Sequence, residues 1–292
     1  MSRSSVLRRR AIAGLTAAAS IALTASAVSS QALAVPSPDR PSATSSTHST
    51  PQWAKIPHSI PESQLSSTYT EVLEKQKVIP SPWDLEIAKG FVAWVMPPTP
   101  EDNKLLQPGL QNNLPLAKLG VALRYQSTPV GGYNELGGMI AYNRGATVAA
   151  NTPFLTTDSD WTNRNGRENW AFPKIKGNFT GIPESGHTFT ASGPNWSVSV
   201  TTRPAPKGAQ LAIPGFLPRL LTLEQVDANG RTITSTFFGR RHIDVSKLMP
   251  VIVDVKTTGS SQLTSLMPTG TFPGFIADPA GMSLETTSGA PR

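Results

Sequence analysis

The chain has 292 residues, with 26 lysines and arginines, 19 aspartates and glutamates, and no cysteine. The lack of cysteine excludes disulfide bonds, thiolate nucleophiles and cysteine-ligated zinc, haem or iron–sulfur sites. The net charge of +7 is concentrated in the first 34 residues, which hold four arginines and no acidic residue, so only +3 remains for the rest. The charge therefore gives no support to nucleic acid as a partner.

Residues 1–34 have the pattern of an export signal. A basic segment precedes a weakly apolar, alanine-rich stretch, and the Ala-Leu-Ala sequence at 32–34 is an A-x-A cleavage site. The stretch also contains many Ser and Thr residues, which makes it a poor membrane anchor. The Arg-Arg pair at 9–10 loosely resembles a twin-arginine signal, so Sec and twin-arginine export both stay open. We therefore expect a secreted or extracytoplasmic protein without stable membrane insertion after cleavage.

Composition divides the remaining chain into three parts. Residues 35–52 are rich in Pro, Ser and Thr and offer almost nothing to bury, which predicts a disordered linker. Residues 53–279 contain neither a repeat nor a second linker, so we expect one domain. Residues 280–292 are predicted to form a flexible tail.

Within the predicted domain, only residues 61–77 show a clear helical pattern, with a stripe of mostly apolar residues at helical spacing after Pro61. The polar segment 158–165 fits either a short helix or a loop. The Asn-Gly pair at 229–230 predicts a type I′ hairpin turn. Elsewhere the runs are short, rich in Val, Ile, Thr, Phe and Trp, and bounded by Pro, Gly and Asn, which indicates a mostly antiparallel β domain. The predicted strands cover residues 91–96, 119–125, 133–142, 188–192, 196–202, 217–226, 231–238 and 250–256.

Several familiar catalytic and binding motifs are missing from the sequence. It has no H-E-x-x-H and no G-x-S-x-G motif, and the glycines of 131–138 lack the spacing of a dinucleotide-binding loop. His58, His187 and His242 are too far apart in sequence to indicate a metal site. We therefore expect no metal and no cofactor, and the search for chemistry narrows to Lys, Glu, Arg and Tyr.

The segment 166–176 places a lysine among apolar residues. Trp170, Phe172 and Ile175 flank Lys174. If the segment is buried, desolvation disfavours the ammonium form and favours the free amine, which can attack a carbonyl group. A lysine that lies along an apolar surface with its amine in water produces the same pattern. The residue types alone leave both interpretations open.

The motif Gly-Arg-Glu-x-x-Ala-Phe-Pro-Lys at 166–174 resembles the active-site segment of the acetoacetate decarboxylase family. Gly-Tyr-Asn-Glu at 132–135 resembles the family's glutamate strand, and residues 214–220 and 227–231 resemble a later strand and its hairpin. The similarity extends from about residue 91 to residue 238. It implies an α+β, mostly β domain built on a conical antiparallel β-barrel with few peripheral helices, and it implies a homo-oligomer.

The resemblance also implies roles for individual residues. Lys174 would form a Schiff base with a small carbonyl compound or oxo acid, and Glu135 would transfer protons. Tyr133, Arg167 and Glu168 would bind the substrate or shape its site, with Arg167 and Glu168 held as an ion pair. The implied reaction is a decarboxylation, in which the protonated imine accepts the electrons that carbon dioxide leaves behind.

Two positions depart from the family pattern. Ile175 stands where the decarboxylases carry a second lysine after the nucleophile, and Lys176, on the same side of an extended strand as Lys174, is a candidate substitute. Residues 84–91 contain no arginine, where the decarboxylases place one that binds the substrate carboxylate, and this leaves Lys89. These departures keep open aldol or dehydration chemistry and a non-catalytic barrel that binds a small molecule. The export signal and the linker keep open a cell-surface interaction protein.

Overall fold

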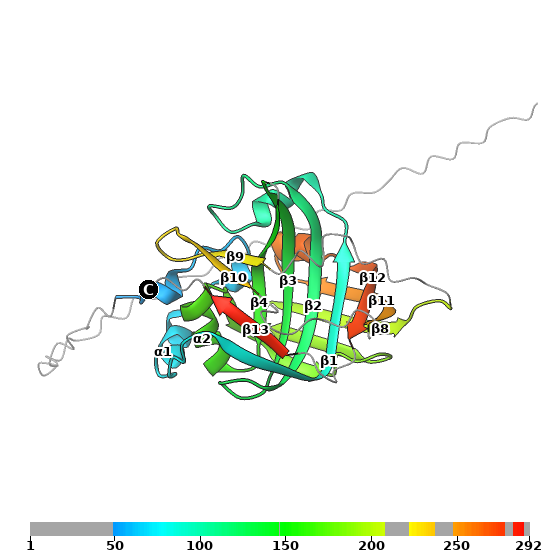
Figure 1. The fold of residues 1–292 in the computed structure, drawn as a ribbon, viewed down its shortest axis with the longest axis horizontal. Coiled ribbons are helices and arrows are strands. Elements are labelled where there is room, and N and C mark those ends of the chain that lie inside the picture. The colour runs from blue at the N-terminus through cyan, green and yellow to red at the C-terminus, as the bar shows by residue number, and fades with distance from the viewer. Residues whose placement is uncertain (1–48, 146, 208–221, 237–247, 278–282, 289–292) are drawn as a thin grey trace, which may run out of the picture. The chain divides into compact units, whose positions relative to one another are not determined.

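A computed structural model describes residues 49–145, 147–207, 222–236, 248–277 and 283–288. These residues fold into a mostly β structure, in which a mixed 13-stranded sheet is accompanied by a few short helices (Figure 1). The expectation of a mostly β domain with few helices is confirmed.

Some predicted features fall on residues that the structure does not describe. These are the export signal at 1–34, most of the linker at 35–52, and the segment 214–220. Within the predicted tail at 280–292, residues 283–288 form a strand.

The first part of the described chain contains two 3-10 helices, η1 (Gln52–Lys55) and η2 (Pro61–Ser63), followed by α1 (Ser67–Glu74). The helix expected over 61–77 is therefore interrupted. The backbone is extended between η2 and α1, and the Ser66 side chain accepts a hydrogen bond from the backbone N–H of Tyr69, which starts α1 afresh. A serine N-cap thus divides the predicted helix.

The other helices are η3 (Pro100–Leu105), α2 (Asp160–Trp170) and α3 (Ser261–Leu266). Both α-helices begin after a serine, Ser159 or Ser260, whose side chain accepts a backbone N–H three residues ahead. The segment predicted as a short helix or a loop is therefore the first half of a longer helix. That helix lies beside α1 at one side of the sheet (Figure 1).

The sheet is ordered β13-β10-β9-β4-β3-β2-β1-β12-β11-β8-β7-β6, with β5 paired to β4. Nearly all pairs are antiparallel, but β4 pairs in parallel with both β5 and β9, so the sheet is mixed. The last strand, β13, pairs with β10 and also with the first residues of β1. The strands are β1 (Trp83–Met96), β2 (Pro115–Ser127), β3 (Tyr133–Arg144), β4 (Thr147–Thr157), β5 (Lys174–Lys176), β6 (Asn178–Gly181), β7 (Thr188–Gly193), β8 (Trp196–Pro204), β9 (Thr222–Val226), β10 (Thr232–Thr236), β11 (Leu248–Thr258), β12 (Gly270–Ala277) and β13 (Ser283–Ser288).

The hairpin predicted at 227–231 connects β9 to β10, but its turn is not of type I′. Gly230 has φ +76°, whereas Asn229 does not have the positive φ that type I′ requires. Instead, the Asp227 side chain accepts the backbone N–H groups of Asn229 and Arg231. The aspartate therefore determines the turn geometry.

Alternate residues of β1 and β2 belong to two separate hydrophobic clusters on opposite faces of the sheet. The first core includes Val92, Trp94, Ala122, Leu136, Ile140 and Phe154, together with residues of β7, β8, β11 and α3. The second core consists of Trp83, Leu85, Phe91, Ala93, Val121, Leu123, Tyr125, Val130, Tyr133, Ala150, Leu155, Trp170, Phe172, Leu223 and Phe275.

The two cores differ in how tightly they exclude solvent. In the first core, Val92 and Ala122 are 0% exposed, as expected for a close-packed interior. In the second core, Phe91, Ala93 and Val121 each keep 9% of their surface exposed. These three side chains of the second core are therefore slightly more exposed than the first-core side chains beside them on the same strands.

Candidate active site around Lys174

The end of α2 determines where Lys174 lies. The helix closes at Ala171, which has left-handed backbone angles of φ 54° and ψ 26°. The backbone N–H of Ala171 donates to the carbonyl of Arg167, and that of Phe172 donates to the carbonyl of Gly166 at 3.1 Å. These bonds satisfy carbonyls at the helix end and reverse the chain; the bond from Ala171 to Arg167 is the one that defines the simple left-handed helix cap. The reversed chain then enters β5 at its first residue, Lys174.

The Lys174 side chain is buried and meets a carboxylate. β5 lies parallel to β4, with Lys174 opposite Leu155, a residue of the second core. The Lys174 Nζ donates to Glu135 Oε2 at 2.8 Å and to Thr162 Oγ1 at 3.1 Å. The lysine is 5% exposed and Glu135 is 6% exposed. The structure thus brings Lys174 and Glu135 together from β5 and β3, as the sequence predicted, while their catalytic roles stay predictions.

Two tyrosines complete the surroundings of this pair. Tyr125 on β2 donates its hydroxyl to Glu135 Oε1 at 3.3 Å, and the ring of Tyr133 has its centroid 5.1 Å from Lys174 Nζ. Burial raises the pKa of each tyrosine well above its ordinary value, and the charge of Glu135 raises it further. Both hydroxyls therefore stay protonated, and the Tyr133 ring is placed as a cation–π partner of the Lys174 amine.

Tyr125 and Thr162 were not predicted as site residues. Tyr125 lies directly opposite Tyr133 in the pairing of β2 with β3, and the two rings are 4.6 Å apart. A correct register between the predicted strands would have placed it in the site. Thr162 lies in α2, whose length the sequence pattern did not reveal, so no comparable signal pointed to it.

Gly166 provides the space that the Lys174 side chain occupies. A Cβ atom at this position of α2 would lie 2.6 Å from Cδ and 2.9 Å from Cε of Lys174. Both separations are far shorter than a van der Waals contact. The glycine of the motif is therefore explained by the path of the lysine side chain along the helix.

Arg167 holds the backbone of the site. Its Nε donates to the carbonyl oxygen of Lys174 at 2.7 Å, and its Nη2 donates to that of Ser63 at 2.8 Å. Burial lowers the pKa of Arg167 to about 9, so the guanidinium is still charged at neutral pH. Arg167 thus ties β5 to η2.

The expected ion pair between Arg167 and Glu168 does not form. Glu168 points away from the buried arginine and pairs with Arg164, one helical turn earlier on the exposed side of α2. The Arg164 guanidinium also lies over the Trp53 ring, 4.2 Å from its centroid. A contact of Arg167 or Glu168 with substrate stays a prediction.

Lys176 and Lys89 are the candidate substitutes for the family's second lysine and its arginine, and the structure describes the side chain of Lys176 only. The amine of Lys176 pairs with Asp160 Oδ1 at 2.9 Å and its side chain is 43% exposed. Asp160 also accepts the Tyr69 hydroxyl, so Lys176 is engaged by the α1–α2 surface. Lys89 lies in β1, and its side chain is outside the part of the chain that the structure describes.

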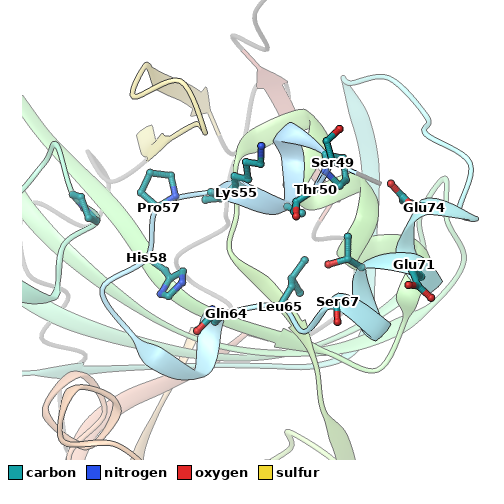
Figure 2. Close-up of a pocket in the computed structure, with 15 residues that line it drawn as sticks. Ser49, Thr50, Lys55, Pro57, His58, Gln64, Leu65, Ser67, Glu71 and Glu74 are labelled. Atoms are coloured by element: carbon teal, nitrogen blue, oxygen red, sulfur yellow. The ribbon is translucent and has the colours of Figure 1, made fainter. Parts of the chain in front are cut away.

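A cavity of about 560 Å³ lies next to η1 and α1. It is lined by residues between Ser49 and Glu74 together with Pro108, and by none of the six candidate site residues. Figure 2 shows Lys55, His58 and Glu71 around it. Burial, and secondarily the charge of Arg167, lowers the pKa of His58.

The described residues contain no group of three His, Asp or Glu side chains placed to hold a metal ion. In that same part of the chain, no helix combines the length and the hydropathy needed to cross a bilayer.

Comparison with known proteins identifies the fold. No family model and no curated protein sequence matches the chain. Among solved structures, the enduracididine biosynthesis enzyme MppR complexed with pyruvate is similar over 74% of this chain and 91% of its own, with 14% identity and a TM-score of 0.51. An acetoacetate decarboxylase structure is similar over 77% and 96%, with 11% identity and a TM-score of 0.50. The chain has the acetoacetate decarboxylase-like fold.

This is the fold that the resemblance of residues 166–174 implies. Sequence identities of 11–14% establish the fold but carry no activity or substrate with them. The function therefore has to be inferred from the residues of the site in this chain.

Proposed function

We propose that the protein is an exported enzyme of the acetoacetate decarboxylase-like superfamily, in which Lys174 forms a Schiff base with a small carbonyl compound or oxo acid. The observation that carries the proposal is the contact between Lys174 Nζ and Glu135 at 2.8 Å, buried on the face of the sheet that holds the second core. A buried amine beside a carboxylate has both the nucleophile and the proton acceptor that imine formation requires.

The first steps use only these two side chains. Lys174 transfers a proton to Glu135, and the free amine adds to the carbonyl carbon of the substrate. The carbonyl oxygen takes up that proton to give a hydroxyl group, Glu135 then carries one of the two protons on the attached nitrogen to this hydroxyl, and water leaves as the nitrogen lone pair forms the protonated imine between substrate and lysine. Glu135 lies close enough to deliver protons to the oxygen because it already contacts the attacking nitrogen.

In a β-oxo acid, the protonated imine then accepts the electron pair of the breaking carbon–carbon bond. Carbon dioxide leaves, an enamine forms, a proton adds to its carbon, and water hydrolyses the resulting imine to release the ketone and Lys174. Aldol condensation and dehydration begin from the same imine and keep the carboxylate. Pyruvate, which is bound in the MppR structure, is therefore a suitable first probe alongside acetoacetate.

We also propose that the sheet closes into a conical barrel and that the chains form a homo-oligomer. Closure is supported by β13, which pairs with β10 on one side and with β1 on the other and so joins the two ends of the path β10-β9-β4-β3-β2-β1.

The proposed export is supported by the signal pattern of residues 1–34. The mass of the secreted protein tests the proposed export, because cleavage after Ala34 gives a chain that begins at Val35.

Borohydride trapping tests the central proposal. The folded protein is incubated with pyruvate, acetoacetate or acetylacetone, the imine is reduced to a stable amine, and the modified lysine is identified by peptide mass. We expect the label on Lys174, its loss in Lys174→Arg because a guanidinium forms no imine, and slower labelling in Glu135→Gln. Labelling spread over the exposed lysines, or no labelling of Lys174 by any of the three compounds, would favour a non-catalytic binding or interaction protein.

A further inference from the structure

The hydrogen bonds of the Lys174 amine give Thr162 a place in the chemistry of the site. Lys174 Nζ donates to Glu135 Oε2 at 2.8 Å and to Thr162 Oγ1 at 3.1 Å. An ammonium group has three N–H donors and no acceptor, so the threonine oxygen accepts in this contact. Two oxygen acceptors from the described part of the chain thus hold two of the three N–H groups.

Thr162 reaches the amine because it lies in the first turn of α2. Ser159 precedes this helix, and its side-chain oxygen accepts the backbone N–H of Thr162 at 3.4 Å. Such an N-cap fixes where the helix begins and therefore where its third residue lies. Thr162 is 0% exposed, so bulk water does not compete with Lys174 for the hydroxyl group.

The start of α2 is also tied to the strand that carries Glu135. Asn134 comes directly before Glu135 on β3, and Asp158 lies just ahead of α2. The Asp158 carboxylate accepts the backbone N–H of Asn134 at 2.8 Å and its side-chain Nδ2 at 2.6 Å. Thr162 and Glu135 come from different elements, and these bonds hold the two elements together around the lysine nitrogen.

The two acceptors differ in basicity. Glu135 is a carboxylate, which can take a proton from the amine and give it back. A threonine hydroxyl is too weak a base to take a proton from an ammonium or iminium group, so it can accept a hydrogen bond without removing the proton. Glu135 is therefore suited to move protons, and Thr162 is suited to keep one on the nitrogen.

This difference orients the amine before it reacts. After Lys174 has transferred a proton to Glu135, its nitrogen keeps two N–H groups and one lone pair. If one N–H stays on Thr162, the lone pair cannot turn towards α2. It then faces either Glu135 or the remaining direction around the nitrogen, from which a carbonyl carbon can approach. Alignment of this kind lowers the barrier to attack.

We propose that Thr162 is a catalytic residue that accepts one N–H of Lys174 from the free amine through to the protonated imine. The proposal rests on the proposed function of Lys174. The nitrogen of the protonated imine has a single N–H. A carboxylate bound to it can remove this proton and leave a neutral imine, which is a weaker electron sink. Thr162 holds the proton in place, and Glu135 stays available for the protons of the substrate.

Variants of Thr162 test the proposal by borohydride trapping, with whichever of pyruvate, acetoacetate and acetylacetone labels the natural protein fastest. Thr162→Val keeps the shape of the side chain and loses the hydroxyl, whereas Thr162→Ser keeps the hydroxyl and loses the methyl group. We expect the trapping rate at Lys174 to fall about tenfold or more in Thr162→Val, as for the loss of a hydrogen bond to a charged group. Thr162→Ser should stay within about threefold of the natural rate.

Deuterium uptake tests the part of the role that concerns the protonated imine. In D₂O, enamine formation replaces the hydrogen atoms next to the carbonyl group of pyruvate or acetone by deuterium. This exchange needs the protonated imine as its electron sink, so Thr162→Val should lower the ratio of the exchange rate to the trapping rate. An unchanged ratio would overturn the role of Thr162 at the imine.

Thr70→Val is the matched control. Thr70 also lies near the start of a helix, α1, and is 7% exposed. Its hydroxyl donates to the backbone carbonyl of Ser66 at 2.9 Å. We expect this variant to lose some stability in urea unfolding and to keep the natural trapping rate at Lys174.

A role of Thr162 in packing alone predicts the reverse order of rates, because valine preserves the volume of the side chain and serine does not. Faster trapping in Thr162→Val than in Thr162→Ser, or a natural rate in Thr162→Val, would overturn the proposal and leave the function of Lys174 intact. If Thr162→Val does not fold, Thr162→Ala and Thr162→Ser, which differ only in the hydroxyl, decide in the same way. If no carbonyl compound labels Lys174 in the natural protein, the proposed function fails, and the role of Thr162 fails with it.

Discussion

Two buried lysines of this sheet each pair with a carboxylate, and they lie on opposite faces. Lys118 on β2 is 3% exposed and lies 3.3 Å from Asp102, and Lys174 on β5 is 5% exposed and lies 2.8 Å from Glu135. Lys118 shares its face with Ala122 of the first core, whereas Lys174 shares its face with Leu155 of the second core.

The partners of the two lysines differ in kind. Lys118 also donates to the backbone carbonyl of Ser265, and Asp102 accepts both the backbone N–H and the hydroxyl of Thr99 at the start of η3. Every contact of that pair holds backbone segments together. Lys174 instead contacts a carboxylate, a hydroxyl and an aromatic ring. Burial and ion pairing alone therefore do not mark a reactive amine, and the face of the sheet and the type of partner distinguish the two.

The largest expected effect comes from the structural pair. Lys118→Met removes the counter-charge of the fully buried Asp102, which should lower the free energy of unfolding by about 3–5 kcal/mol. Urea unfolding measures the loss. The fraction that stays folded should still be labelled at Lys174 by pyruvate at the natural rate. If labelling falls in proportion to stability, the two lysines do not act independently.

Removal of both charges at the candidate site should not lower the free energy of unfolding, in contrast to Lys118→Met. Lys174→Met combined with Glu135→Gln removes both charges at once, and replacement of a buried ion pair by uncharged residues is often neutral or stabilising by about 1–4 kcal/mol. The double variant Lys118→Met with Asp102→Asn is the control, and it should remain destabilised because Asp102 also caps η3. Equal urea midpoints for the two double variants would remove the distinction drawn here.

The sequence was sufficient to identify the Lys174 segment because its residues act locally. Gly166, Arg167 and Ala171 each lie within eight residues of Lys174, and each has a distinct part in placing it. The motif was therefore recognisable without knowledge of the fold. Glu135 was found through the resemblance of its own short motif.

The rest of the site and fold depended on contacts between distant residues. Tyr125 enters the site through strand register, and Thr162 through the length of α2. The parallel pairs of β4 with β5 and β9 depend on where the chain returns after α2 and β8. Ser66 interrupts a helical stripe that apolar spacing alone predicts to be continuous. Neither the spacing of apolar residues nor the composition of a segment predicts such features.

A smaller effect is expected from Gly166→Ala. This change should move the Lys174 side chain without lowering the stability of the folded protein. Alanine is favoured over glycine by about 1 kcal/mol in a helix interior, so urea unfolding should show no loss of stability. The new Cβ displaces the Lys174 side chain from its path. An off-rotamer lysine costs about 0.5–1.5 kcal/mol, which predicts up to about a tenfold fall in borohydride trapping.

Gly145→Ala is the control for this change, because no atom lies within 4 Å of a Cβ placed at Gly145. Its φ of +59° is unfavourable for alanine, so we expect a small loss of stability in urea unfolding. Its trapping rate should equal that of the natural protein. If Gly166→Ala also leaves the rate unchanged, the lysine does not need the position observed in the structure.

The smallest expected effect concerns pH and the charge of Arg167. Burial and Arg167 lower the pKa of His58 below its ordinary value of 6.5. As the pH falls below 6.5, the unfolded chain takes up the proton before the folded chain does, so the stability that neutral His58 allows is present above pH 6.5 and declines below it. Urea unfolding at pH 5 and pH 7.5 should show a larger acid loss in the natural protein than in His58→Gln. Identical losses would show that Arg167 and burial do not act on this histidine.

The left-handed cap at Ala171 has a consequence for how such a protein diverges. The helix end, the reversal and the lysine are determined by hydrogen bonds within the nine residues 166–174. Such a segment keeps its geometry while distant parts of the chain change, because few long-range contacts have to change with it. Such a segment can therefore stay recognisable in a chain that is only 11–14% identical to solved structures of similar fold.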